Sequence, residues 1–176
     1  MITKDSKADK VIKKAQKHVD NMLPTGLNES KACFYHARAV AHVLDQMGWD
    51  RVLLQAGSAS FLADPTSVEP HPSHYSYVFE AGPLEVMRCL EAGHMPEVHV
   101  WVAAREYETS EYVIIDTTTK YLPSLSKSMG LPWKAPKPPE YLWALASELP
   151  EGWHYVADAK ATAMVYQFHS LLPSLG

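Results

Sequence analysis

The sequence predicts an α+β fold, and three observations support this prediction. Two amphipathic helical patterns open the chain, alternating or β-branched patterns of strands follow, and one more helical pattern closes it. Helices that precede a run of strands favour a mostly antiparallel sheet with helices packed on it. The chain has 176 residues, a length that suits one domain with a core that needs no disulfide or structural metal.

The first two elements are expected to be helices. Residues 5–23 repeat apolar side chains at helical spacing with lysines between them, and a proline and a glycine follow. Residues 31–47 show the same period before a glycine that suits a C-terminal cap. Ser30 and Asn28 are the candidate N-caps of this second helix. Cys33 is therefore expected in its first turn.

After the second helix, the period changes to that of extended chain. Two segments are the clearest strands, one alternating and one β-branched, and the polar residues 105–111 join them as a hairpin. The expected elements of this region are strands at 51–56, 75–79, 98–103 and 112–115, and a short helix at 83–90.

The last third of the chain is rich in proline. Residues 122–150 contain six prolines and are expected to be mostly irregular, with one short helix at 140–149. A last strand is expected at 153–156, and Asp158 is placed to cap a closing helix that reaches residue 172.

Composition excludes several classes of protein. Apolar residues make up 47% and charged residues 20%, which is an ordinary globular mixture. The net charge is −4 and no basic stripe is present, so no nucleic-acid partner is expected. We expect no membrane partner either, because no long apolar run is present, and the N-terminus does not resemble a signal peptide. Cys33 and Cys89 are too few for a disulfide framework, so a reducing, cytoplasmic location is expected.

Three residues in separate elements have the chemistry of a thiol nucleophile. A thiolate is stabilised by the free N–H groups at a helix start and by a neighbouring imidazolium. Cys33 has the first of these. His99 lies inside an apolar strand and could supply the second, and Asp116 ends the next strand, where it could orient the imidazole across a hairpin. Taken singly, each residue also fits a structural role: a buried thiol, a core histidine and a turn former.

The same residues carry a resemblance to a known family. The helix start Lys31-Ala32-Cys33-Phe34, the strand Val98-His99-Val100-Trp101-Val102 and the strand end Ile114-Ile115-Asp116-Thr117-Thr118 resemble motifs of the transglutaminase-like superfamily of papain-fold enzymes. Their order and their separations, 66 residues (99 − 33) and 17 residues (116 − 99), are also similar to those of the family. The resemblance covers about half of the chain.

The resemblance implies a papain-like fold and a cysteine-dependent reaction on an amide. Cys33 would attack the carbonyl carbon, His99 would move the proton and Asp116 would orient His99, without a cofactor or metal. The acyl-enzyme would pass to water in a protease, peptidase or deamidase, or to an amine in a transglutaminase-type transferase. The expected partner is a protein or peptide substrate, and the oligomeric state stays open.

The chain departs from the family just before the cysteine, where the family's Gly-x-Cys-Trp is absent. This departure leaves a non-catalytic protein-binding module on the same fold as the alternative. The Cys33 backbone N–H is the first candidate donor to an oxyanion, and Asn28 is the candidate for the second.

The domain is expected to span residues 1–176, with three parts. Residues 1–29 form the N-terminal helix and lead-in, 30–121 the catalytic-type core, and 122–176 the proline-rich segment, last strand and C-terminal helix.

Other candidate residues surround this core. His36 lies one helical turn from Cys33 and is assigned to the substrate side of the site or as a rival base. Trp101, Trp133 and Trp143 are assigned to substrate binding, although the last two could equally anchor a long loop. A zinc site from His71, His74, His94 and His99 lacks a supporting cysteine pair or helical histidine motif, so no metal is expected.

Overall fold

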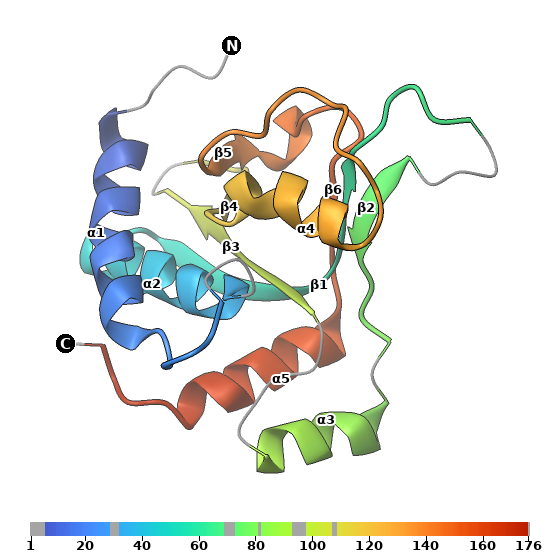
Figure 1. The fold of residues 1–176 in the computed structure, drawn as a ribbon. Coiled ribbons are helices and arrows are strands. Elements are labelled where there is room, and N and C mark those ends of the chain that lie inside the picture. The colour runs from blue at the N-terminus through green and yellow to red at the C-terminus, as the bar shows by residue number, and fades with distance from the viewer. Residues whose placement is uncertain are drawn as a thin grey trace.

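The computed structural model describes residues 6–28, 32–68, 73–80, 82–92, 98–106 and 109–175 (Figure 1). Along the chain, the helices and strands alternate much as expected. The elements are α1 (Ser6–Met22), α2 (Cys33–Gln46), β1 (Arg51–Leu62), β2 (His74–Tyr77), α3 (Pro83–Glu91), β3 (His99–Arg105), β4 (Val113–Asp116), η2 (Thr119–Tyr121), α4 (Leu122–Ser128), β5 (Leu142–Leu145), η3 (Ala146–Glu148), β6 (His154–Ala157) and α5 (Ala159–Ser170).

Six strands form one curled antiparallel sheet, which agrees with the expected α+β class. β1 is the longest strand and pairs with β2, β3 and β6, and β3, β4 and β5 follow one another by antiparallel pairing. The expected hairpin between β3 and β4 is present.

The pairing of β1 places β2 beside the start of β3. Gly57 pairs with His99 of β3 on one edge and with Ala157 of β6 on the other, while Ala59 pairs with β6 and with Tyr77 of β2. Because β6 occupies one edge at both positions, β2 and β3 share the opposite edge, one after the other.

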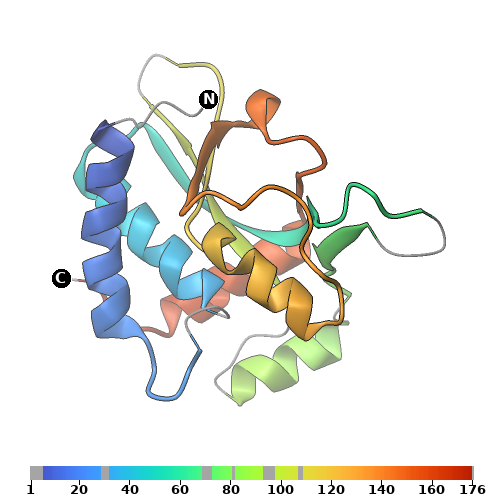
Figure 2. The ribbon, with the colours of Figure 1, turned by 45° about the horizontal axis from the view of Figure 1, so that its top comes forward.

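Each face of the sheet has its own apolar core. On one face, α1, α2 and α5 pack on alternate residues of β1, β3 and β4, and Leu44, Val102 and Val165 are among the fully buried members. Figures 1 and 2 show α4 and the chain that follows it lying over a different side of the sheet from α1 and α2. That second core contains Phe61 and Trp101. The helices therefore divide between the two faces. Cys33 packs against the first core, whereas His99 contacts Phe61 and Trp101 of the second.

Two expectations about local structure are wrong. Residues 140–149 do not form a helix; Leu142–Leu145 is strand β5, because its residues pair with β4 and complete the sheet. Residues 122–150 are also less irregular than expected, since α4 follows Asp116 closely with a proline in its first turn.

The start of α2 also differs from the expectation. Ala32 occupies its N-cap position and makes no side-chain capping bond, and Asn28 lies farther from the helix start. Ser30, the other expected cap, lies outside the described residues. Within the described part of the chain, no helix combines the length and apolar character needed to cross a membrane.

Candidate active site

Cys33 is the first residue of α2, as expected from the helical pattern. Its side chain is partly buried, and Sγ lies 3.6 Å from the carbonyl oxygen of Val98. Val98 immediately precedes the first residue of β3, so the sulfur lies beside the start of that strand. The first backbone N–H groups of a helix have no partner within the helix, and they stabilise negative charge placed near them.

His99 is the first residue of β3 and is completely buried. Asp116 is the last residue of β4, and the register places it next to the pair of Val102 with Ile115, so it lies opposite Trp101. His99 therefore lies diagonally across the ladder from Asp116, a distance that long side chains can bridge. Nε2 of His99 lies 2.7 Å from Oδ2 of Asp116.

Asp116 accepts four hydrogen bonds. Its Oδ1 receives the backbone N–H and the hydroxyl of Thr118 at 2.8 and 2.7 Å. Its Oδ2 receives the phenol of Tyr155 at 2.9 Å in addition to the His99 ring. Both carboxylate oxygens are thereby held in place, which fixes the orientation of the imidazole that they contact.

Aromatic rings enclose His99. Tyr77 stacks on it with ring centroids 4.5 Å apart, Trp101 lies roughly parallel at 6.0 Å, and Phe61 meets it edge-on at 5.9 Å. Tyr155 completes the set at 5.9 Å. These rings come from β1, β2, β3 and β6, so the curled sheet itself surrounds the imidazole.

The charges of the pair reinforce one another. Burial alone lowers the pKa of His99, but the Asp116 carboxylate, followed by the Cys33 thiol, raises this pKa above its usual range. Burial alone raises the pKa of Asp116, but the His99 ring and the bonds from Thr118 lower it below its usual range. Asp116 is therefore ionised at neutral pH, and His99 is held as the imidazolium.

The second ring nitrogen of His99 faces a different neighbour. Nδ1 is buried and has no partner of normal hydrogen-bond geometry among the described residues. The Cys33 thiol contributes to the raised pKa of the same ring, so sulfur and imidazole are neighbours. One nitrogen is thus occupied by Asp116, and the other is open to the thiol or to a reacting group.

Two tyrosines and one threonine of this site were not expected from the sequence. Burial and then the Asp116 carboxylate raise the pKa of Tyr155 well above its ordinary value, which keeps it a donor. Tyr77 has a raised pKa because of burial first, with Tyr75, Cys33 and Asp116 adding to it. Only Thr118 has a local signal in the sequence, because aspartate often binds the backbone two residues on.

The other expected site residues are distributed around this centre. His36 is buried, and Nδ1 lies 3.1 Å from the hydroxyl of Thr117. Its ring also meets the ring of Tyr121 edge-on, with centroids 6.5 Å apart. Trp101 is also buried, and its Nε1 donates to Gln55 at 3.1 Å, so it supports the His99 ring from within the core. Asn28 is exposed before the segment 29–31, which lies outside the described residues.

Trp133 and Trp143 lie in different cores. Trp133 is half-buried against the core that contains Phe61 and Trp101, and its Nε1 donates to Pro136 O at 3.1 Å. Trp143 packs against the core on the helix face, where it meets Trp49 edge-on at 5.7 Å. The two tryptophans therefore do not share one wall.

Only two of the four histidines that could suggest a zinc site, His74 and His99, lie among the described residues. His71 and His94 lie outside the described residues, His74 bonds Ser73 at 2.8 Å, and His99 is occupied by Asp116. Within the described part of the chain, no cluster of three metal-binding side chains is present.

Comparison with known proteins returns no relative for this chain: no family model, no curated protein and no solved structure matches it.

Proposed function

We propose that this chain is a cysteine-dependent amide hydrolase or acyl transferase on a transglutaminase-like, papain-like fold. Cys33 is the proposed nucleophile, His99 the acid and base, and Asp116 the residue that orients His99. The observation that carries the proposal is the His99 ring, which binds Asp116 through Nε2 at 2.7 Å and neighbours the Cys33 thiol.

In the proposed reaction, the Cys33 thiol has already given its proton to Nδ1 of His99, so that a thiolate faces the imidazolium, and the thiolate attacks the amide carbon. A C–S bond forms, the C–N bond breaks, and the proton on His99 goes to the departing amine. The oxyanion of the intermediate would accept from the Cys33 backbone N–H at the start of α2. Water then attacks the thioester, with His99 as base, and releases the acid and the free thiol.

The surroundings of the pair support this cycle. A carboxylate with four donors does not rotate away from the imidazole, and the aromatic rings limit water at His99. Partial burial of Cys33 leaves the sulfur open to small reagents. A reducing compartment such as the cytosol would keep the thiol free.

The proposal is tested with p-nitrophenyl acetate, an activated ester that requires no knowledge of the natural substrate. Attack by Cys33 forms an acetyl thioester and releases p-nitrophenolate, which gives a burst of colour equal to the enzyme concentration. We expect the burst in the wild-type chain and in Cys89→Ser, and its loss in Cys33→Ser. Peptide mapping locates the acetyl group.

A second measurement separates hydrolysis from transfer. If methylamine accelerates the loss of the acetyl group from the folded chain but not from the same acetylated chain unfolded in urea, an amine can replace water as the acceptor. The enzyme proposal is contradicted if Cys33 and Cys89 are acetylated equally and if His99→Ala leaves the acetylation unchanged. That result would favour the protein-binding module, which the missing Gly-x-Cys-Trp context suggests.

A further inference from the structure

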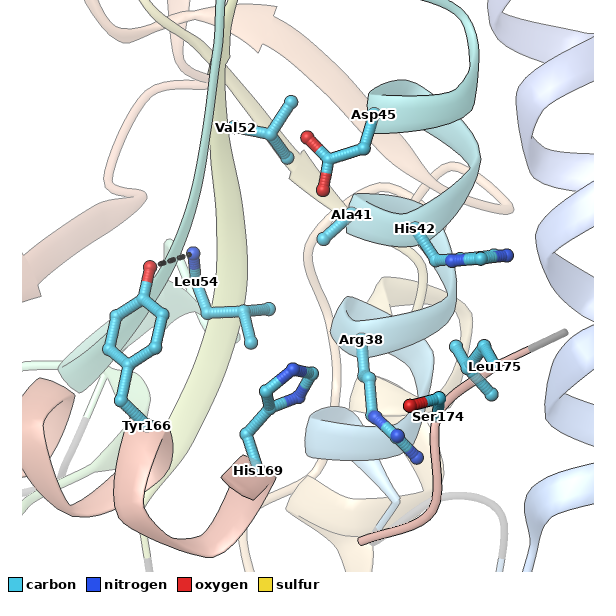
Figure 3. Close-up of a pocket in the computed structure, with 10 residues that line it drawn as sticks. All are labelled: Arg38, Ala41, His42, Asp45, Val52, Leu54, Tyr166, His169, Ser174 and Leu175. Carbon is cyan, nitrogen blue, oxygen red and sulfur yellow. Dashed lines mark hydrogen bonds between the residues drawn. The ribbon is translucent and has the colours of Figure 1, made fainter.

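A pocket separate from the candidate active site lies between α2, β1, α5 and the C-terminal segment (Figure 3). Its volume is about 280 Å³, which is large enough for a small organic molecule. The walls combine apolar side chains with a few polar ones, and they include Arg38, Ala41, Asp45, Leu54, His169 and Leu175.

Arg38 is a buried cation at one end of this pocket. It is only 5% exposed, and among the described residues no carboxylate lies within ion-pair distance of its guanidinium. Its partners are neutral: NH2 donates to the carbonyl oxygen of Pro173, and NH1 lies 3.5 Å from the sulfur of Met22. Its Nε has no partner in the described part of the chain. A buried charge is costly unless an opposite charge accompanies it.

His169 adds a second polar group beside Arg38. Figure 3 shows its ring reaching from α5 into the pocket toward α2. Its Nδ1 is buried and has no hydrogen-bond partner among the described residues. Arg38 Nε and His169 Nδ1, from different helices, thus lie at the same end of the pocket, and neither has an acceptor among the described residues.

Charge and shape define the ligand. Arg38 is the one permanent cation of the described lining, while Asp45 lies at the other end, seven residues or about two helical turns along α2. His42, on the same helix, turns its ring toward α1, where it meets His18 edge-on at 5.0 Å. One cation matches one negative charge, and Asp45 would repel a second. Ala41, Leu54 and Leu175 offer an apolar wall between the two ends.

From this geometry we infer a binding site for a small monocarboxylate with a short apolar chain. The carboxylate accepts from the Arg38 guanidinium and from His169, and the apolar chain lies against Ala41, Leu54 and Leu175. Tyr166 lines the rim, where its hydroxyl already accepts from Leu54 N at 3.1 Å and so helps to hold β1 at the pocket (Figure 3).

The test is calorimetric titration of the Cys33→Ser chain, in which the proposed thiol chemistry is absent. Sodium hexanoate is expected to bind saturably with one site per chain. Acetate should bind more weakly because it lacks the apolar chain, and hexanol because it lacks the charge. Arg38→Gln should lower the affinity for hexanoate by about tenfold or more. Arg88→Gln, which removes an exposed arginine of α3, is the matched control and should leave the affinity unchanged.

A second variant keeps the test decisive if Arg38→Gln does not fold. His169→Ala removes the other donor, and its hexanoate affinity should fall severalfold. No saturable binding of hexanoate overturns the site. Equal binding to the Cys33→Ser chain and to the same chain with Arg38→Gln or His169→Ala overturns its location. Equal binding of hexanol, or tighter binding of inorganic phosphate, overturns the monocarboxylate assignment.

Discussion

At the scale of single residues, the thiol and the imidazole differ in how tightly they are held. His99 is completely buried and is bound through Nε2 to a carboxylate that accepts four hydrogen bonds. Cys33 is half-buried, and the contact of its Sγ with Val98 O is weak, at 3.6 Å. A loosely held nucleophile beside a fixed base is an arrangement that suits nucleophilic catalysis.

This difference predicts selective alkylation. Iodoacetamide should label Cys33 well before Cys89, although both thiols are half-buried, because only Cys33 has an imidazolium and a helix start beside it. His99→Ala should slow the labelling of Cys33 by about tenfold or more. Asp116→Asn should slow it less, because it changes the orientation of the base and not the base itself. Peptide mapping after brief labelling measures all three rates.

His36 provides the control for this prediction. It lies on the same helix but is bonded to Thr117 at 3.1 Å. In His36→Ala, iodoacetamide should therefore label Cys33 nearly as fast as in the wild-type chain. If His36→Ala slows the reaction and His99→Ala does not, His99 is not the base.

The raised pKa of His99 also predicts how stability changes with pH. Its folded-state pKa lies above the unfolded value of about 6.5. The stabilisation is therefore complete below that pH, and it is lost as pH rises through the raised pKa. Between pH 6 and 9, the free energy of unfolding should fall more in the wild-type sequence than in His99→Gln. The difference should grow by up to about 1.4 kcal/mol for each pH unit above the unfolded-state pKa.

Urea unfolding at several pH values measures this difference. Both chains should carry Cys33→Ser, so that no thiol beside the ring titrates. Parallel stability curves for the two chains would show that His99 does not form a stabilising imidazolium with Asp116.

At the scale of elements, β1 holds the site together because other strands pair with both of its edges. Gly57 is the residue at which β3 and β6 lie on opposite sides. A Cβ atom added at Gly57 would lie 2.2 Å from the backbone oxygen of Val156 and 2.8 Å from the backbone nitrogen of Asp158. Only a residue without a side chain lets β6 approach and bring Tyr155 to Asp116.

We therefore expect Gly57→Ala to destabilise the fold by about 3 kcal/mol or more, because the contact is with backbone that cannot move aside cheaply. Chemical unfolding gives the loss. Ser60→Ala, three residues along the same strand, is the control and should change stability little. A Gly57→Ala chain as stable as the wild type would mean that β6 does not pack so closely on β1.

Most elements could be predicted from local periodicity, but their boundaries and some of their types could not. The helices that contain Val19 and Leu44 have a clear apolar face. The sequence predicts a helix where β5 lies, because the strand is short and its character comes from pairing with β4, which no local pattern contains. The pair of His99 and Asp116 was predictable from the hairpin. Tyr77 and Tyr155 were not, because β2 and β6 reach the site through long-range pairing.

At the scale of the whole molecule, the proline-rich segment between α4 and β5 forms bonds with the end of β1 and with α1. The backbone N–H groups of Lys134 and Ala135 donate to Ala63 O, just beyond β1, at 2.7 and 2.8 Å. The side chain of Lys134 pairs with Asp64 at 2.8 Å. Farther along, the phenol of Tyr141 donates to Asp9 of α1 at 2.6 Å. The segment is therefore anchored at both ends, and Figure 1 shows it crossing the molecule.

Trp133 within this segment and Trp143 in β5, just after it, should respond differently to substitution. Trp143→Ala should lower the free energy of unfolding by about 2–3 kcal/mol, because the ring packs on the helix-face core and on Trp49. It should leave the reactivity of Cys33 unchanged toward iodoacetamide and toward bulky peptide-like thiol reagents alike. Trp133 packs instead on the core around Trp101, the face to which His99 and Asp116 belong.

We expect Trp133→Ala to keep more of its stability and to change the rate at which bulky reagents, but not iodoacetamide, reach Cys33. A stiff segment that packs on the same core as Trp101 is placed to form one side of a substrate cleft, and proline reduces the entropy lost when a ligand is clamped. Thermal unfolding and paired labelling rates for the two variants measure both effects. If Trp133→Ala also leaves the rates with large and small reagents unchanged, the segment serves only to cover the sheet, and it forms no wall of a substrate cleft.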